Sequence, residues 1–276
     1  MQQVRVDGSF DGWRSAARGL LHRGVAPHQV EWLGLEDMGG LFDEPCTPEP
    51  KDSAPAPRIP RQLMIELQSA ARFRAQDRWS LLYRILWRTA KGDQTARLMG
   101  DPDGSELHAR IKAVRRETHH MHAFIRFSPT NQEDAPDYVA WFEPMHDILA
   151  SAAPHFAERM GLHSWLIATP DDAVLWDGGV MHHAVPCPAA WRQLARTAQD
   201  TGAELWKTYY ESTFNPARLN SDVLQSNLPV RFWKNLPEGP LIPQLMSRAR
   251  AGAQRDGQAE RVAHKPGKRI GPHAKA

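Results

Sequence analysis

The chain has 276 residues and a net charge of +2, with 41% apolar and 24% charged side chains, a composition typical of a globular protein with a hydrophobic core. No apolar run approaches the ~20 residues of a membrane span, and the N-terminus lacks a basic start followed by an apolar stretch, so we expect a soluble, cytoplasmic protein without a signal peptide. With two cysteines, Cys46 and Cys187, we expect no disulfide framework, and an all-cysteine metal or cluster site within the chain is excluded.

Residues 1–42 are predicted to form a small N-terminal α/β segment, and residues 43–60 a proline-rich linker or extended surface crossing. The linker holds six prolines, and proline fixes φ and removes a backbone donor. Ser9 or Asp11 is expected to cap the helix of the segment. The expected elements are a strand at Val4–Val6, a helix at Phe10–His22 and a strand at Val30–Leu33.

Residues 61–247 are predicted to form the main domain, an α+β fold whose central antiparallel ββαββ sheet is covered by helices on one side. Apolar spacing predicts three helices before the sheet, the third running from about Ser105 into the histidines at 119–122. Thr169–Asp172 has turn composition with proline at its second position, so the last two strands are expected to form a hairpin. The later elements are strands at Ala123–Phe127, Tyr138–Phe142, Ser164–Ala168 and Ala173–Trp176, a helix within Met145–Met160, and a helix at Ala189–Thr213 with a possible break at Gly202.

Residues 248–276 are predicted to be a disordered basic tail, because the apolar content collapses there. From Leu241 to the end, eight Lys and Arg residues stand against two acidic residues, a local charge of +6, so the rest of the chain carries −4 by subtraction from +2. Such a tail is typical of a segment that contacts phosphates and equally of a solvated chain end, and both interpretations stay open.

Long stretches of the chain carry a resemblance to one family, and together they cover roughly residues 4–246. The stretches are residues 7–21, Val114–Phe127, Tyr138–Leu149, Ala168–Asp171 with Trp176–Asp177, and Leu205–Arg218 continuing to Phe232–Pro237. They resemble the uncharacterised "probable DNA metabolism protein" family, in which this domain accompanies a radical-SAM DNA-repair protein or is fused ahead of an iron–sulfur uracil-DNA glycosylase. The opening residues 7–21 resemble the start of the fused members.

The resemblance implies a DNA-repair-associated accessory protein that binds nucleic acid or a repair enzyme of the radical-SAM or uracil-DNA glycosylase type. It implies no mechanism of its own. The glycosylase itself is absent, since it would need four cluster cysteines and a glycine-rich uracil pocket. The chain also departs from the lysine-rich stretch expected after Asn-Pro-Ala-Arg218, because it has Asn220–Asp222 and Gln225–Asn227 there. Part of any phosphate contact made by those lysines in relatives is therefore missing.

A basic and aromatic surface is the expected nucleic-acid contact. In the predicted strand Ala123–Phe127, alternation would place His122, Phe124 and Arg126 on the open face of the sheet, where bases can stack and phosphates can pair. Packing of the same face against a helix is the alternative. The candidate nucleic-acid-binding residues are Arg115, Arg116, Phe124, Arg126, Arg218 and Lys234.

An enzyme acting on damaged or modified nucleotides is the alternative function. Its candidate catalytic residues are His119, His146 and Asp171, which in a ββαββ unit could meet at one end of the sheet with Arg126 and Arg218 nearby. Histidine titrates near neutral pH and arginine can hold a phosphate. Ordinary turn chemistry is the competing interpretation of Asp171.

No metal and no cofactor is predicted. His119, His120 and His122 could bind zinc together with His146, or with His182, His183 and Cys187. The chain lacks a second cysteine pair and a His-Glu-x-x-His spacing, so hydrogen bonding of these histidines to the backbone is favoured. A third class, a pure protein-interaction module, would lack a convergent polar cleft.

Overall fold

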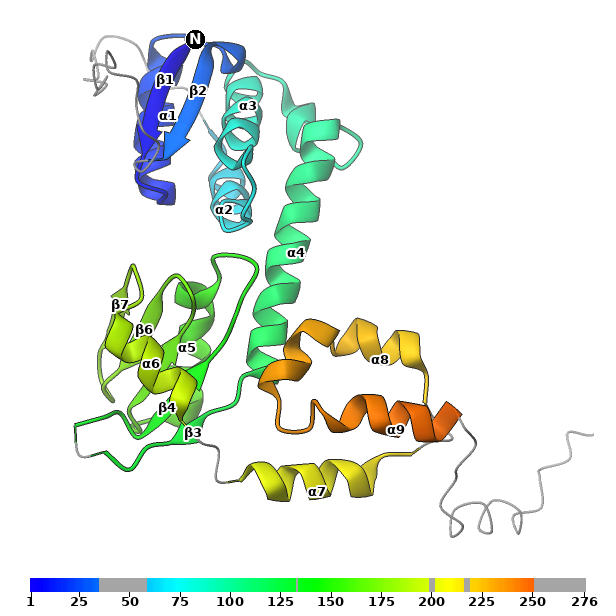
Figure 1. The fold of residues 1–276 in the computed structure, drawn as a ribbon. Coiled ribbons are helices and arrows are strands. Elements are labelled where there is room, and N and C mark those ends of the chain that lie inside the picture. Colours follow the sequence, from blue (N-terminus) through cyan, green and yellow to red (C-terminus); the bar gives the residue numbers. More distant parts are fainter. Residues whose placement is uncertain (35–58, 133, 199–201, 216–218, 251–276) are drawn as a thin grey trace, which may run out of the picture.

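The structure is a computed structural model in which the chain forms two lobes joined by one long helix, α4 (Pro102–Phe124) (Figure 1). The predicted linker lies almost entirely outside the described residues, and the predicted tail lies outside them beyond residue 250. None of the described helices has the length and apolar character needed to cross a membrane. The described residues are 1–34, 59–132, 134–198, 202–215 and 219–250.

The N-terminal lobe packs a two-stranded parallel sheet against helices. Its predicted strands and first helix are confirmed, and Ser9 is the helix cap, accepting a hydrogen bond from the Gly12 N–H at 2.9 Å. Trp13 and Leu82 are fully buried in its core. The elements of the lobe are β1 (Gln2–Val6), α1 (Phe10–His22), the short 3-10 helix η1 (Pro27–Gln29), β2 (Val30–Gly34), α2 (Arg61–Ala70), α3 (Arg78–Ala90) and the 3-10 helix η2 (Gln94–Arg97).

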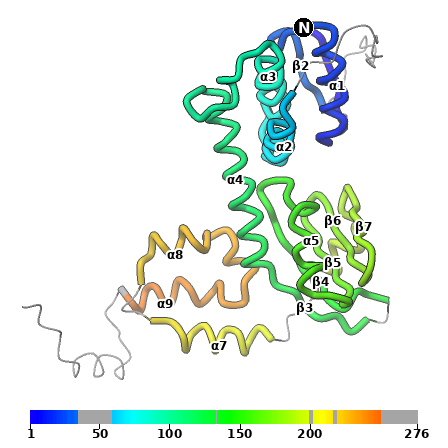
Figure 2. The backbone as a smooth tube through the Cα atoms, turned by 180° about the vertical axis from the view of Figure 1, so that it is seen from behind, coloured from blue at the N-terminus to red at the C-terminus, as the bar shows by residue number. Residues whose placement is uncertain are grey.

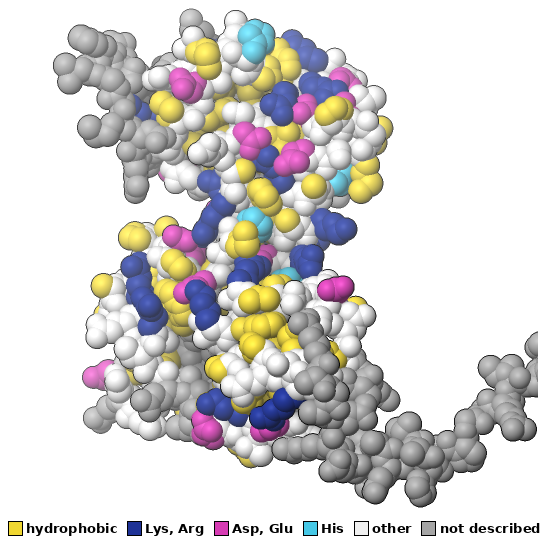
Figure 3. Space-filling view, turned by 45° about the vertical axis from the view of Figure 1, so that its right-hand side comes forward, with side chains coloured by type: hydrophobic (Ala, Val, Ile, Leu, Met, Phe, Trp, Pro, Cys, Tyr) yellow, Lys and Arg dark blue, Asp and Glu magenta, His cyan; other side chains and the backbone are white. Residues whose placement is uncertain are grey.

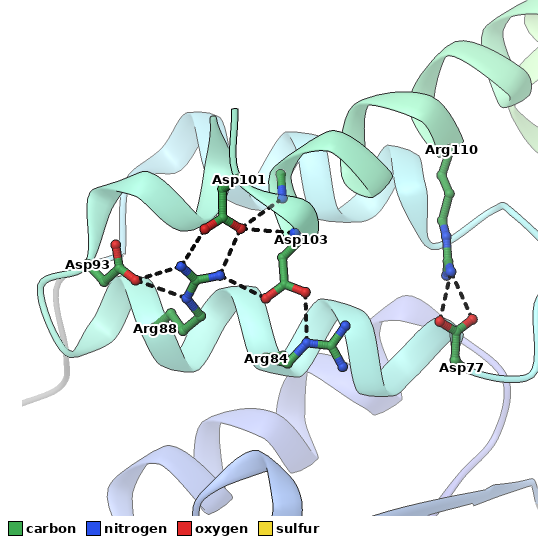
Figure 4. A network of polar contacts seen from close by, with 8 residues as sticks. Asp77, Arg84, Arg88, Asp93, Asp101, Asp103 and Arg110 are labelled. Atoms are coloured by element: carbon green, nitrogen blue, oxygen red, sulfur yellow. Dashed lines mark hydrogen bonds and ion pairs between the residues drawn. The ribbon is translucent and has the colours of Figure 1, made fainter. Parts of the chain in front are cut away.

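Ion pairs fix the start of α4 against α3. Asp101 caps α4 by accepting hydrogen bonds from the backbone N–H groups of Asp103 and Gly104. Arg88 of α3 binds Asp101 at 2.6 Å and also pairs with Asp93 and Asp103 (Figure 4). The Arg88 guanidinium lowers the pKa of Asp101 to about 2. Charge-assisted hydrogen bonds therefore hold the first turn of α4 on the N-terminal lobe.

Helix α4 contributes to two separate hydrophobic cores. Leu107 and Ile111 belong to the core of the N-terminal lobe, and Val114 and Met121 belong to the core of the other lobe. The N-terminal segment thus shares its core with α2 and α3, rather than packing apart from residues 61–247.

The C-terminal lobe contains a five-stranded mixed sheet in the order β3-β4-β5-β6-β7. The strand pair β4–β5 is parallel because α5 crosses over between the two strands, and the other three pairs are antiparallel. The α+β class is confirmed, whereas the antiparallel ββαββ arrangement is not. The elements are β3 (Ser128–Pro129), β4 (Tyr138–Trp141), α5 (Leu149–Met160), β5 (Trp165–Ala168), β6 (Ala173–Trp176) and β7 (Met181–Ala184).

Helices cover both faces of this sheet, so the prediction of one covered face is wrong. Ile167 and Val174 lie in the core on the α5 side. Val139 and Leu166 lie in the core on the opposite side, where α6 (Ala189–Thr197) packs. A strand buried on both faces loses its polar alternation, as all four residues of β5 show by being buried.

The first predicted strand, Ala123–Phe127, is also wrong. Helix α4 continues through Phe124, and the strand that follows is β3. Val114, Met121 and Ile125 all pack into the C-terminal core, and their spacings of seven and four residues extend the helical stripe. Phe124 therefore lies on no sheet face, and its ring packs against Phe232 at 5.6 Å.

The last helices group beside the lower half of α4, as the view from behind shows (Figure 2). The predicted helix Ala189–Thr213 is divided into α6 and α7, and α7 begins directly after Gly202. The strand β7 and the helix α8 were not predicted. The remaining elements are α7 (Ala203–Thr213), α8 (Ser221–Asn227), the 3-10 helix η4 (Val230–Asn235) and α9 (Leu241–Arg250).

Candidate functional site

An open cleft of about 560 Å³ lies between β4, the end of α6 and η4. Three cationic residues line it, Arg126, Arg196 and Lys234, and Glu143 is the only carboxylate among its lining residues. The lining therefore carries two more positive than negative charges. Clefts lined by one sign of charge concentrate ligands of the opposite sign.

One wall of the cleft joins an indole ring and a guanidinium group. Trp141 ends β4, and its indole N–H donates a hydrogen bond to Oε1 of Glu143 at 3.1 Å. Arg196, in the last turn of α6, places its guanidinium carbon 5.4 Å from the centroid of the Trp141 ring. Arg196 is exposed and forms no ion pair within the described chain, and its charge acts on the Glu143 carboxyl only as a minor cause of that group's lowered pKa. Arg196 is thus a positioned cation whose charge is available to a ligand.

The second cation of the cleft, Lys234, comes from η4. Its ammonium group forms a close ion pair with Oε2 of Glu143, and this contact lowers the pKa of the Glu143 carboxyl. Because Lys234 is largely exposed, water screens this pair, and its contribution to stability is small. A phosphate group could therefore share or replace the carboxylate as partner of Lys234.

The third cation, Arg126, is held more firmly. Its Nη2 lies 3.2 Å from Oε1 of the buried Glu238, and its Nη1 donates to the carbonyl oxygens of Ala123 and Ile125 at the end of α4. Its guanidinium carbon also lies 5.3 Å from the centroid of the Trp206 ring. These contacts fix the guanidinium group at the edge of the cleft.

A buried polar centre lies between α4 and η4. Glu117 is only 4% exposed, pairs with Arg231, and accepts the backbone N–H of Met145 at 2.9 Å. His120 and His146 are buried near this pair, and the Nδ1 atom of each has no hydrogen-bond partner in the described part of the chain. Burial is the main cause that lowers the pKa of both imidazoles.

The structure does not join the three predicted catalytic residues. His119 is exposed on α4, His146 is buried against an aromatic ring of the α2–α3 loop, and Asp171 pairs with Arg74 at 2.7 Å. All three are described, and no hydrogen bond, ion pair or ring contact links any two of them. Asp171 and His146 are connected only through Arg74, which pairs with Asp171 and also with Asp147, the residue after His146.

Of the six predicted nucleic-acid-binding residues, Arg126 and Lys234 come together in the cleft. Figure 3 shows that Lys and Arg side chains also gather around the narrow region between the lobes. Arg115 and Arg116 are exposed on α4, and Arg116 donates a hydrogen bond to the Ser226 carbonyl oxygen. Phe124 is partly buried. Arg218 lies outside the described residues.

Sequence reasoning missed Trp141 and Arg196. They come from β4 and α6, and their contact arises only because α6 packs on the sheet beside β4. No local pattern signals such a pairing, since a strand tryptophan and a helical arginine are each ordinary residues in their elements.

The fold and cleft define an α+β protein with a cation-lined cleft beside a mixed sheet. The chain matches DUF4130, a domain of unknown function, over residues 76–238, and it belongs to that family. No curated protein and no solved structure matches the chain. Every residue that lines the cleft falls within the matched range, whereas a second hollow of about 480 Å³ beside α1 is lined mostly by residues before it. The cleft therefore lies within the family domain, as does a further hollow of about 430 Å³ lined by residues such as Leu166, Leu175 and Trp191.

Proposed function

We propose that this protein is a DNA-repair-associated accessory protein that binds nucleic acid through the cleft of Arg126, Arg196 and Lys234. The observation that supports binding is the convergence of three cations, from the end of α4, from α6 and from η4, on one open cleft. Arg and Lys side chains provide most protein contacts to phosphate oxygens. The repair setting, and a partnership with a radical-SAM repair protein or a uracil-DNA glycosylase, rest on the family resemblance of the sequence.

The three cations contribute unequally. Arg126 is neutralised by the buried Glu238 and tied to backbone carbonyls, so it shapes the cleft and adds little free charge. Arg196 has an available charge, and Lys234 has only a screened partner. We therefore assign most of the phosphate attraction to Arg196 and Lys234.

The test is the salt dependence of binding. A double variant, Arg196→Gln with Lys234→Gln, is compared with wild type by fluorescence anisotropy, using labelled single-stranded and duplex oligonucleotides between 50 and 200 mM salt. Each lost phosphate contact reduces the slope of log K against log salt by about 0.9 on duplex and about 0.7 on single strands. We expect a reduction of about 1.8 or about 1.4, respectively, and weaker binding throughout.

The matched control removes two exposed charges elsewhere, Arg14→Gln on α1 and Arg159→Gln on α5. It keeps the same net charge as the cleft variant. If wild type binds no nucleic acid, or if the control lowers affinity and slope as much as the cleft variant, the cleft is not the binding site.

An enzyme acting on damaged or modified nucleotides is the second candidate. The buried centre of Glu117, Arg231, His120 and His146 is the observation that favours it. None of these four residues lines the cleft, so we favour binding. Incubation with modified deoxynucleotides and product detection by mass spectrometry tests the alternative. Product formation by wild type that disappears in His146→Ala would establish an enzyme.

A further inference from the structure

Helix α7 presents aromatic side chains that the described part of the chain leaves partly exposed. None of its residues is buried. Leu205, Trp206 and Tyr209 are 78%, 40% and 56% exposed. The rings of Trp206 and Tyr209 lie on one face of the helix, with centroids 5.5 Å apart and planes inclined by 38°. Two large, partly exposed rings therefore lie side by side.

This aromatic pair is continuous with the cation-lined cleft. Arg126 is shared between them, because it lines the cleft and places its guanidinium carbon 5.3 Å from the centroid of the Trp206 ring. Its bonds to Glu238 and to the end of α4 hold it in that position. In Figure 1, α7 lies below α9, with its first residues toward β3. The shared Arg126 therefore makes the aromatic pair and the cleft direct neighbours.

Exposed aromatic rings beside cations favour a ligand that carries both flat rings and negative charges. Nucleobases stack on exposed aromatic rings while the phosphates of the same strand pair with cations. In a duplex, the base faces are already stacked on one another and cannot reach a protein ring without being flipped out. A surface of this kind therefore discriminates in favour of unpaired nucleotides.

We propose that the protein binds single-stranded nucleic acid, with bases stacked on Trp206 and Tyr209 and with phosphates held by the cleft cations. This inference rests on the proposed function, since it assumes that the cleft binds phosphates. A protein partner that covers α7 would be recognised by its apolar surface, and Leu205 would then matter as much as the rings.

The experiment compares a 12-nucleotide single strand with the blunt duplex of the same sequence, by anisotropy at fixed salt. Wild type is expected to prefer the single strand. Trp206→Ala and Tyr209→Ala should each weaken single-strand binding by about tenfold, the loss typical of one stacked base, with duplex binding unchanged. Trp206→Phe, which keeps a ring, should retain most of the affinity. Leu205→Ala, the control on the same helix, should bind as wild type does.

The outcomes separate this inference from the proposed function. Equal affinity for single strand and duplex, or no loss in Trp206→Ala, overturns the inference and leaves phosphate binding by the cleft standing. Equal losses in Leu205→Ala and Trp206→Ala also overturn it, because they show that the affinity does not depend on stacking against the rings. Failure of wild type to bind either form overturns both. Because these side chains are exposed, circular dichroism of the variants should match that of wild type.

Discussion

Replacing Arg231 by methionine tests the ion pair that anchors η4 to α4. The variant keeps an apolar stem that can pack on the Phe232 ring, over which the guanidinium lies at 4.4 Å, but it removes the positive charge. Glu117, 4% exposed, is then left in the interior without its ion-pair partner, and the Met145 N–H stays as its hydrogen-bond donor. The pair also positions Lys234, which follows on the same 3-10 helix.

The expected loss follows from the burial of the pair. Removing one partner of a buried ion pair costs about 3–5 kcal/mol, because the other charge is left uncompensated. Arg231 is 32% exposed, so water already screens part of the attraction. We therefore expect the free energy of unfolding to fall by about 2–3 kcal/mol. A double variant with Glu117→Gln removes the uncompensated charge and keeps an acceptor for Met145, so it should be more stable than the single variant.

The assay is urea unfolding at neutral pH, followed by circular dichroism and tryptophan fluorescence. Arg115→Met, an exposed arginine on the same helix α4, is the control and should change stability by less than about 0.5 kcal/mol. The reasoning is refuted if the Arg231 variant behaves like this control. It is also refuted if adding Glu117→Gln lowers stability further by its full independent cost, since coupled partners are not additive.

Two further predictions concern pH and backbone packing. Burial lowers the folded-state pKa of His120 and His146 below the ordinary value of 6.5, so the unfolded state binds more protons just below that pH. The free energy of unfolding should therefore fall as pH drops from about 7 toward 5.5. In a variant with both residues changed to Phe, the free energy of unfolding should depend less on pH, and an unchanged pH dependence would contradict the assignment. Gly239→Ala should lower Tm strongly, because a Cβ there would lie 1.7 Å from the carbonyl oxygen of Trp233. In Gly100→Ala the added Cβ meets nothing within 4 Å, so Tm should stay nearly unchanged. Similar Tm values for the two variants would show that the backbone relaxes around the new methyl group.

Local sequence patterns predicted the elements that are stabilised by contacts between residues close in the chain. The Ser9 cap and the helix that follows it were predictable because the cap bonds three residues ahead. The hairpin of β5 and β6 was predictable because Thr169 bonds Asp172 within the turn, through both backbone and side chain. Such contacts join residues that are close in the sequence, so they can be predicted without knowing the rest of the fold.

The elements that were predicted wrongly, or not at all, depend on tertiary contacts. The five residues after His122 fit both a strand alternation and a continued helix. The helix continues only through Phe124, and Ile125, its extended C-cap, packs into the same core as Met121. The strand β7 carries His182 and His183 and has no apolar alternation, so only its pairing with β6 defines it. In the candidate site, Arg126 and Lys234 were identified by residue type, but their meeting with Arg196 depends on three elements far apart in the sequence.

The sharing of α4 between two cores has a thermodynamic consequence. Leu107 and Ile111 of this helix stabilise one lobe, and Val114 and Met121, immediately beyond, stabilise the other. A helix transmits order along its length, since each added residue propagates on a turn already formed. The two lobes are therefore expected to unfold as one cooperative unit. A ligand bound in the cleft would then protect amide hydrogens of the N-terminal lobe from exchange, although it touches none of that lobe's residues.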